Sequence, residues 1–307
     1  MSTTKIEWTD RVWNPVRGCA LVSPGCTNCY AMRQAHRFSG EGAAYAGLTR
    51  LTTHGPVWTG RARLVPGILA EPLRWGKPAR VFVNSMSDLF HDDLTNEQIA
   101  AVFGVMAATP WHTYQVLTKR PERMRSWFGW AEKLTLGQIG GLADKLMGRP
   151  ALQYGAKWPL HNVWLGVSVE DQQRAGERIP HLLATPAAVR FVSCEPLLGP
   201  VDLTHIGTFR GEPLSALEEC VGHVERPKLD WVIVGGESGP GARPFDLAWA
   251  RSIVEQCRDV GVPVFFKQTG TVLARSLGLA DRKGGDITDP RFPADDFRVR
   301  EFPGAKS

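Results

Sequence analysis

The sequence predicts an α/β protein built as a (β/α) barrel, partial or complete, with loop-rich insertions. Six short apolar runs recur along the chain, and most are β-branched or aromatic, nearly continuous and closed by a polar residue. Such runs are typical of buried parallel strands. Helical patterns follow several of them, and strand–helix alternation implies right-handed βαβ units. The predicted strands are residues 81–84, 114–119, 163–168, 189–195, 231–237 and 262–267, after a short first strand that precedes Cys19.

Helix start and stop signals support this alternation. Thr95 and Gln98 have the spacing of a capping box, so a helix is predicted to begin there. Pro121 suits the first position of a helix after the second predicted strand. Asp246 can cap a later helix, which Gly261 would end.

The chain of 307 residues is long enough for one large domain, and we expect a single domain over residues 1–307. Within it we expect a cysteine loop at 18–30 and a loop-rich insertion at about 36–75. A second insertion is expected at 200–229, and an irregular C-terminal tail at about 270–307.

Composition places the chain among ordinary globular proteins. Hydrophobic residues make up 43% and charged residues 22% of the sequence. No apolar run approaches membrane-spanning length, and the polar start MSTTKIEWTD lacks a signal-peptide core. We therefore expect a cytoplasmic protein, whose thiols stay reduced and bind metal in preference to forming disulfides.

Three cysteines near the N-terminus carry the strongest functional signal. Cys19, Cys26 and Cys29 have the spacing Cys-x6-Cys-x2-Cys. Iron–sulfur clusters are held by cysteine thiolates, usually four when the cluster only transfers electrons. Three thiolates on a four-iron, four-sulfur cluster would leave one iron open to a ligand, which indicates chemistry at that iron.

Other interpretations of the cysteines stay open. His36 follows Cys29 by seven positions, so a Cys3His zinc site is an alternative. It would make the chain a zinc-stabilised nucleic-acid-binding protein without redox chemistry. Unligated thiols or a disulfide are a third interpretation.

Polar residues close nearly every predicted strand. In a parallel barrel all carboxyl ends of the strands open on one face, where active sites lie. We therefore expect a shared polar mouth. Lys119 and Arg120 could hold a carboxylate or phosphate, and Glu170 and Glu195 could accept hydrogen bonds from hydroxyl or amino groups. A further alternative is a hydrolase in which Asp88, Glu170 and Glu195 hold divalent metal ions.

Basic residues are concentrated in one segment. Residues 31–80 carry eight Lys and Arg side chains against Glu41 and Glu71, whereas the net charge of the whole chain is +5. Basic clusters favour anionic partners such as nucleotides or nucleic acid. A solvated basic face is the plain alternative. The candidate substrate-binding residues are Arg50, Arg61, Arg63, Arg120, Glu237 and Lys267.

The motifs together resemble a known family. They are TKIEWTDRVWNPVRGC, SPGCTNCYAM, VFVNSMSDLFHDD, VLTKRPERM, NVWLGVSVEDQ, FVSCEPLLGP, VIVGGESGPGARP and VPVFFKQTG. The chain looks like an uncharacterised family common in phages and prophages, known for its three-cysteine motif. That family in turn resembles the radical S-adenosylmethionine superfamily. The first cysteine gap of six departs from the three that is usual in the superfamily.

The resemblance implies a TIM-like barrel of the radical S-adenosylmethionine type. It implies a [4Fe-4S] cluster on Cys19, Cys26 and Cys29, and S-adenosylmethionine bound at the open iron and cleaved reductively to a 5′-deoxyadenosyl radical. An electron donor such as flavodoxin or ferredoxin is implied as well. The expected substrate is a nucleotide or nucleic acid, for base modification or repair. The candidate cofactor-binding residues are Tyr30, Asn84, Lys119, Ser168, Glu170 and Glu195, and no residue is singled out as catalytic.

Overall fold

Contacts divide the chain into two compact units. One comprises Met1–Leu165 with Thr185–Ala188, and the other comprises Gly166–Ala184 with Val189–Ser307. The computed structural model describes residues 4–148, 157–209, 212–218, 220–221, 224–279, 284–285, 287, 292 and 297–304. No helix in those ranges is both long and apolar enough to cross a membrane.

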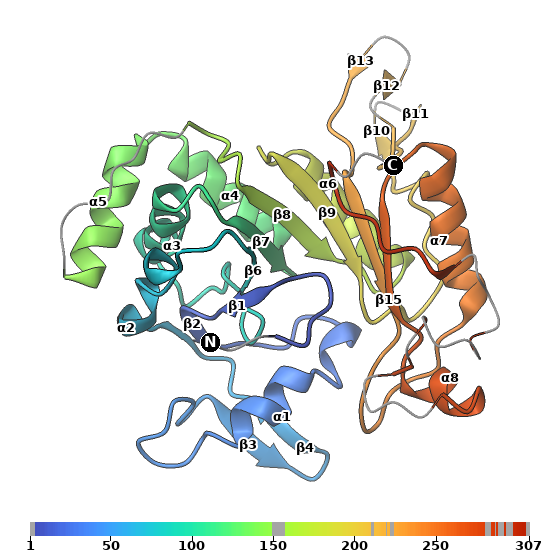
Figure 1. The fold of residues 1–307 in the computed structure, drawn as a ribbon, viewed down its shortest axis with the longest axis horizontal. Coiled ribbons are helices and arrows are strands. Elements are labelled where there is room, and N and C mark those ends of the chain that lie inside the picture. Colours follow the sequence, from blue (N-terminus) through green and yellow to red (C-terminus); the bar gives the residue numbers. More distant parts are fainter. Residues whose placement is uncertain are drawn as a thin grey trace. The chain divides into compact units, whose positions relative to one another are not determined.

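The first unit holds the N-terminal strands and five α-helices (Figure 1). The strands are β1 (Arg11–Trp13), β2 (Val16–Gly18), β3 (Thr49–Thr52), β4 (Gly55–Trp58), β5 (Ala62–Leu64), β6 (Arg80–Val83) and β7 (Thr113–Thr118). The helices are α1 (Tyr30–His36), α2 (Pro66–Leu69), α3 (Asn96–Ala108), α4 (Pro121–Ala131) and α5 (Leu136–Met147), with 3-10 turns η1 (Pro24–Cys26) and η2 (Pro72–Arg74).

The second unit repeats the strand–helix alternation. β8 (Val163–Ser168) begins in the first unit and ends in this one. The other strands are β9 (Val189–Cys194), β10 (Thr208–Phe209), β11 (Glu212–Pro213), β12 (Cys220–Val221), β13 (Val224–Glu225), β14 (Trp231–Gly235) and β15 (Val264–Gln268). The helices are α6 (Gln172–Leu183), α7 (Leu247–Asp259) and α8 (Thr271–Ser276).

The six predicted long strands and the short first strand are confirmed, but the predicted barrel is wrong. The main sheet has the order β1-β6-β7-β8-β9-β14-β15, so β1 and β15 are its two edges and the described strands do not close into a ring. The free side of β15 is taken by the C-terminal segment. Phe266 N donates to Val299 O, and Glu301 N donates to Val264 O, both at 2.9 Å. Those hydrogen bonds use the edge that closure would require.

The predicted helix signals are confirmed where the structure describes them. Thr95 and Gln98 form the capping box of α3, Pro121 is the first residue of α4, and Asp246 caps α7 by accepting from Ala248 N. In the first unit α3 packs against α5 and α4, and Phe103 of α3 stacks on Trp127 of α4 with ring centroids 4.4 Å apart.

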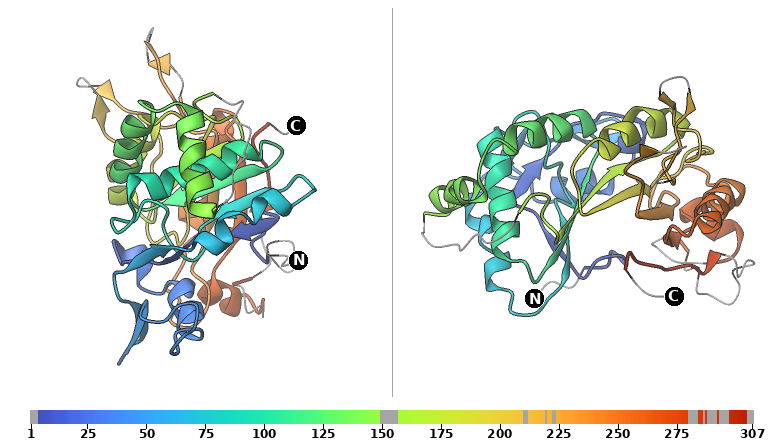
Figure 2. Two further views of the ribbon diagram at one scale, coloured as in Figure 1. Left: turned by 90° about the vertical axis from the view of Figure 1, so that its left-hand side faces the viewer. Right: turned by 90° about the horizontal axis from the view of Figure 1, so that it is seen from above.

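The insertion at about 36–75 is more ordered than the sequence predicts. β3 and β4 form an antiparallel hairpin packed against α1, and β5 pairs antiparallel with β2. Met32 and Ala35 of α1 share a small apolar core with Tyr45, Leu48 and Trp58. We call α1, β3, β4 and the residues between them, 30–58, the N-terminal lobe. In Figure 1 and in the left view of Figure 2, α1 and the β3–β4 hairpin form a group set apart from β6 and β7.

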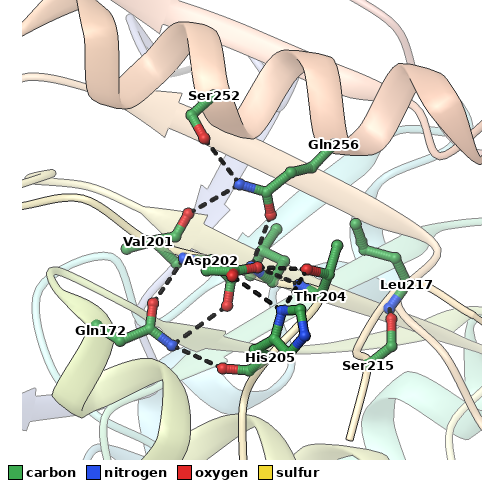
Figure 3. A network of polar contacts seen from close by, with 10 residues as sticks. Gln172, Val201, Asp202, Thr204, His205, Ser215, Leu217, Ser252 and Gln256 are labelled. Carbon is green, nitrogen blue, oxygen red and sulfur yellow. Dashed lines mark hydrogen bonds and ion pairs between the residues drawn. The ribbon is translucent and has the colours of Figure 1, made fainter. Parts of the chain in front are cut away.

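In the second unit, two glutamine side chains fasten the loop after β9 (Figure 3). Gln256 of α7 accepts from Leu203 N at 2.7 Å and donates to Val201 O at 3.1 Å. Gln172 of α6 accepts from Asp202 N at 2.6 Å and donates to His205 O at 3.0 Å. Two hairpins, β10–β11 and β12–β13, follow within the insertion predicted at 200–229. Residues 210–211, 219 and 222–223 of that insertion lie outside the described residues.

The predicted irregular tail, 270–307, is described only in part. It contains the short helix α8 and the segment that pairs with β15. Residues 280–283, 286, 288–291, 293–296 and 305–307 lie outside the described residues.

Candidate active site

The three predicted ligand cysteines lie on one loop of the first unit. Cys19 follows β2, Cys26 ends the turn η1, and Cys29 is the residue before α1. Cys26 N donates to Ser23 O at 2.9 Å and Cys29 N to Cys26 O at 3.2 Å, so two consecutive turns carry the last two thiols. All three are half-buried free thiols. Among the described residues, no three His, Cys, Asp or Glu side chains are already gathered as a metal site.

This cysteine loop is attached to the carboxyl end of β6. Gly18 forms a parallel bridge with Ser87, and Ser87 Oγ donates to Val16 O at 2.9 Å. On the other side of the loop, Tyr30 Oη donates to Ser85 O at 2.6 Å. The thiols therefore lie beside the residues that follow β6.

Gly18 is required at the point where the loop leaves β2. Its φ of +88° lies in the left-handed region, and a Cβ there would approach Arg61 O to 2.2 Å. A side chain at this position would therefore meet backbone as well as an unfavourable φ.

Asn84, the residue directly after β6, also has a positive φ. It is the one described non-glycine residue with positive φ, at 61°. Its side chain is buried, and Oδ1 accepts from Val16 N at 3.2 Å. Nδ2 is buried too, without a hydrogen-bond partner among the described residues. Asn tolerates this backbone region better than most residues.

Asp88 organises the ends of β6 and β7. Its Oδ1 accepts from Thr118 Oγ1 at 2.7 Å, and its Oδ2 accepts from Lys119 N at 3.1 Å and from Arg120 Nη1 at 3.0 Å. Asp88 and Arg120 are both buried, with side chains 6% and 8% exposed. The Asp88 carboxylate thus fixes the position of Arg120, and both of its oxygens already accept hydrogen bonds.

The Asp88–Arg120 pair reaches the cysteine loop. Burial raises the pKa of the Cys19 thiol to about 12, and the negative charge of Asp88 adds to this while Arg120 opposes it. Burial also raises the pKa of Cys29, against the positive charge of Lys119. Lys119 and Arg120, which the sequence offers as binders of a carboxylate or phosphate, thus lie near enough to act on the cysteine thiols.

His36 lies far along its helix from the cysteines. It is the last residue of α1, seven positions after Cys29, which is about 10 Å of helix rise. Its Nδ1 is within hydrogen-bonding distance of Thr49 Oγ1, at 3.0 Å. Zinc ligands sit about 2.0–2.3 Å from the metal, so the geometry does not favour His36 as a fourth ligand beside Cys29.

In the second unit, Glu170 forms a buried ion pair. Arg178 Nη1 donates to Glu170 Oε2 at 2.9 Å and to Ser168 O at 2.8 Å. The side chains of Glu170 and Arg178 are 1% and 6% exposed. The partner of Glu170 is therefore Arg178 of α6, a residue that the sequence analysis did not name as a site residue.

Glu195 and Lys267 form a second pair, at the ends of β9 and β15. Lys267 Nζ lies 2.9 Å from Glu195 Oε1, and Ser193 Oγ donates to Glu195 Oε2 at 3.3 Å. A Cβ on Gly235 would come within 2.7 Å of Glu195 Oε1. The space that this glycine leaves is therefore filled by Glu195.

Glu237 is paired in the same way. Arg243 donates to it through its backbone N, its Nε and its Nη2, the last at 2.6 Å. At the preceding residue, a Cβ on Gly236 would meet Thr269 O at 2.4 Å. The glycines here allow two loops of the chain to approach each other closely.

The predicted site residues thus fall into two described groups. Cys19, Cys26, Cys29, Tyr30, Asn84, Lys119 and Arg120 lie together in the first unit. Ser168, Glu170, Glu195, Glu237 and Lys267 lie at strand ends of the second unit. Arg50, Arg61 and Arg63 are exposed residues of the first unit, on β3, just before β5, and on β5.

Comparison with known proteins identifies the family. No curated protein and no solved structure matches the chain. Residues 3–292 match the family model described as "Protein of unknown function (DUF5131)". Since the match covers nearly the whole sequence, the chain belongs to the DUF5131 family.

Proposed function

We propose that this protein is an iron–sulfur enzyme of the radical S-adenosylmethionine type, with Cys19, Cys26 and Cys29 as the cluster ligands. One observation supports it above the others: the cysteine loop is fastened to the carboxyl end of β6, beside the buried Asp88–Arg120 pair. In α/β proteins ligands bind outside the carboxyl ends of parallel strands. A redox centre at this place would adjoin a ligand-binding edge of the sheet.

The residues present suit such a cluster chemically. Three free thiols on one short loop are the donors that iron–sulfur clusters use. The buried Nδ2 of Asn84, unpartnered among the described residues, lies at the same strand end and could donate to a bound cofactor. The chemistry that such a cluster would supply when bound is one-electron reduction of S-adenosylmethionine, with flavodoxin or ferredoxin as the electron source, to methionine and a 5′-deoxyadenosyl radical that takes a hydrogen atom from the substrate.

The chain's own residues would position the cofactor. Lys119 carries a positive charge next to Cys29 and could bind a carboxylate. Tyr30 holds the third cysteine against β6 through its hydrogen bond to Ser85 O. Glu195 stays a candidate for hydroxyl or amino groups. Because Arg178 encloses Glu170, we expect Glu170→Gln to change stability more than cofactor binding.

The alternatives receive less support. A zinc-stabilised nucleic-acid-binding protein requires His36 close to the cysteines, whereas it lies at the other end of α1. A divalent-metal hydrolase requires free carboxylates, whereas Asp88, Glu170 and Glu195 are each paired with a cation. We place the proposed chemistry in the cytoplasm, where thiols are kept reduced.

Metal analysis tests the proposal. Protein purified without air should be brown and contain about four irons and four sulfides. Cys26→Ala should lose the colour and most of the iron, whereas the matched variant Cys257→Ala should keep both, because Cys257 is a buried thiol of α7 in the other unit. Stoichiometric zinc in place of iron would contradict the proposal.

Cofactor cleavage tests the second step. Reduced protein with its cluster should convert S-adenosylmethionine to 5′-deoxyadenosine and methionine, measured by chromatography. Lys119→Ala should raise the cofactor concentration needed for half-maximal cleavage while iron content stays unchanged. An intact cluster that yields no 5′-deoxyadenosine with any reductant would show that the cluster serves another reaction.

A further inference from the structure

Two arginines of the first unit converge on a single carbonyl oxygen. Arg17 Nη1 donates to Ala44 O at 3.3 Å, and Arg63 Nη2 donates to the same oxygen at 3.2 Å. The two residues face each other in register across the β2–β5 pair. Like charges directly opposite on paired strands destabilise the pair, so the arrangement needs an explanation.

No carboxylate of the described chain forms an ion pair with either arginine. Glu71 is near enough to Arg17 for that charge to lower the Glu71 pKa, which burial raises overall. Asp93 instead accepts a hydrogen bond from the backbone N of Ala62, the residue before Arg63, at 2.9 Å. Arg17 is further positioned over the ring of the buried Tyr45, 5.7 Å from its centroid.

We propose that Arg17 and Arg63 bind a backbone phosphate of a single-stranded nucleic acid substrate. Two guanidinium groups held by one carbonyl and one ring offer several N–H donors to one anion, and an anion between them would remove their repulsion. This inference names the substrate class of the proposed enzyme and in that respect rests on the proposed function.

The position of the pair connects it to the cysteine loop. Arg17 lies two residues before Cys19, on the strand that leads into that loop. Gly18 between them bridges to Ser87 at the carboxyl end of β6. A phosphate on the arginine pair would therefore place the attached nucleotide next to the proposed cluster.

Exposed aromatic and basic side chains nearby favour a nucleic acid strand. Phe38 and Tyr30 are 52% and 55% exposed, an unusual degree for aromatic residues, and Phe38 O accepts from Tyr45 N under the arginine pair. Arg50 and Arg61 are exposed and form no ion pair with a described residue. Single-stranded nucleic acids bind to surfaces of this kind, where bases stack on aromatic rings and cations follow the backbone.

Fluorescence anisotropy with a labelled oligothymidylate of about 12 nucleotides tests the proposal. The anaerobically purified parent should bind at low salt, with an affinity that falls steeply between about 50 and 200 mM salt. Arg17→Gln with Arg63→Gln should weaken binding about tenfold or more at low salt. The slope of log affinity against log salt should become shallower by about 0.7, since the pair binds one phosphate and each phosphate contact on a single strand contributes about 0.7.

A matched pair of substitutions controls for net charge. Arg74→Gln with Arg125→Gln removes the same charge from two exposed residues of the same unit that do not converge. This control should bind within about twofold of the parent. Arg63→Gln alone, with unchanged circular dichroism and thermal midpoint, should weaken binding by less than the double variant, because Arg17 still contacts the phosphate.

The proposal is overturned if the parent does not bind the oligonucleotide, or if the control pair weakens binding as much as the Arg17 and Arg63 pair. Equal competition by thymidine monophosphate and by the oligonucleotide, at the same phosphate concentration, would overturn the assignment to a polymer. Iron content is measured on the same samples. If the parent has its full iron content but does not bind the oligonucleotide, this inference fails while the proposed cluster stands. If the parent lacks iron, the proposed cluster fails.

Discussion

Single residues at the ends of β2 and β6 shape the cysteine loop. Gly18 and Asn84 both have positive φ; the Asn84 side chain accepts from Val16 N of β2, and Gly18 lies against the backbone of Arg61. For a non-glycine residue such as Asn84 this conformation costs about 1–3 kcal/mol and persists where the surroundings fix it, whereas glycine adopts it freely. Two residues with positive φ thus lie beside three free thiols. This indicates that the local backbone is adapted to hold the cysteine loop rather than to form the most stable turn.

Gly18→Ala tests this at one residue. Its Cβ would lie 2.2 Å from Arg61 O, so the loop must shift, and we expect a loss of stability above the ~1–2 kcal/mol of left-handed strain alone. Gly47→Ala is the matched control, because Gly47 has φ of +73° but nothing within 4 Å of its Cβ. Urea unfolding and iron content measure both. Equal stability losses and equal iron in the two variants would contradict a special role for Gly18.

At the scale of elements, the sequence predicted strands and helix starts far better than their assembly. The long strands are found where continuous apolar runs stand, since burial on both faces leaves a strong pattern. The strands of the segment 36–75 were missed because strands of three or four residues are too short for alternation to show. Barrel closure was predicted wrongly because strand periodicity does not reveal which segment pairs with an edge. The residues 299–301 that cover β15 lack any long apolar run.

In the candidate site, too, features formed by neighbouring residues could be predicted from the sequence, whereas contacts between residues distant in the sequence could not. The cysteine spacing and the polar residue that closes nearly every strand could be found in the sequence because they are local. The partners of the strand-end carboxylates could not. Arg178 lies eight residues beyond Glu170 and Arg243 six beyond Glu237, and only the fold turns them back onto those carboxylates. Arg17 and Arg63 are 46 positions apart and meet only through the β2–β5 pairing.

Removal of residues 297–307 tests the role of the C-terminal segment. Glu301 O accepts from Trp231 Nε1 at 2.9 Å, and Phe297 packs on Phe266 with ring centroids 5.1 Å apart. Truncation should expose the β15 edge, lower the thermal midpoint and promote aggregation, as unpaired strand edges do. Light scattering and hydrogen exchange of the β15 amides measure this. Removal of 305–307 alone serves as the control, and equal behaviour of the two truncations would contradict the assignment.

At the scale of the whole molecule, charge is distributed unevenly in relation to ion pairs. The carboxylates at the strand ends are neutralised one by one by arginine or lysine. The arginines Arg37, Arg50, Arg61 and Arg63 have no ion-pair partner among the described residues. Residues 31–80, which include most of the N-terminal lobe, carry eight Lys and Arg against two Glu, so this segment supplies the excess of positive charge. An anionic partner attracted by the molecule as a whole would be drawn to that region.

Buried histidines should make the stability of the molecule depend on pH. Burial lowers the pKa of His91 and of His112, and in each case a nearby arginine adds to the effect. His112 Nε2 also accepts a hydrogen bond from Trp111 Nε1 at 3.0 Å, which protonation would break. The unfolded chain therefore binds protons more readily than the folded one. The stabilisation is present above the unfolded pKa of about 6.5 and is lost as the pH falls below it.

His112→Gln should therefore reduce the loss of stability between about pH 7.5 and about pH 5.5. The variant will be less stable than the parent at the higher pH, because His112 packs edge-on against Trp75 and Tyr114. What decides the matter is the difference in unfolding free energy between the two pH values, obtained from urea titrations followed by tryptophan fluorescence. His54→Gln removes an exposed imidazole from the turn between β3 and β4 and should keep the parent's difference. If His112→Gln loses as much stability on acidification as the parent, protonation of His112 does not contribute, and the acid sensitivity must come from His91 or from the paired carboxylates.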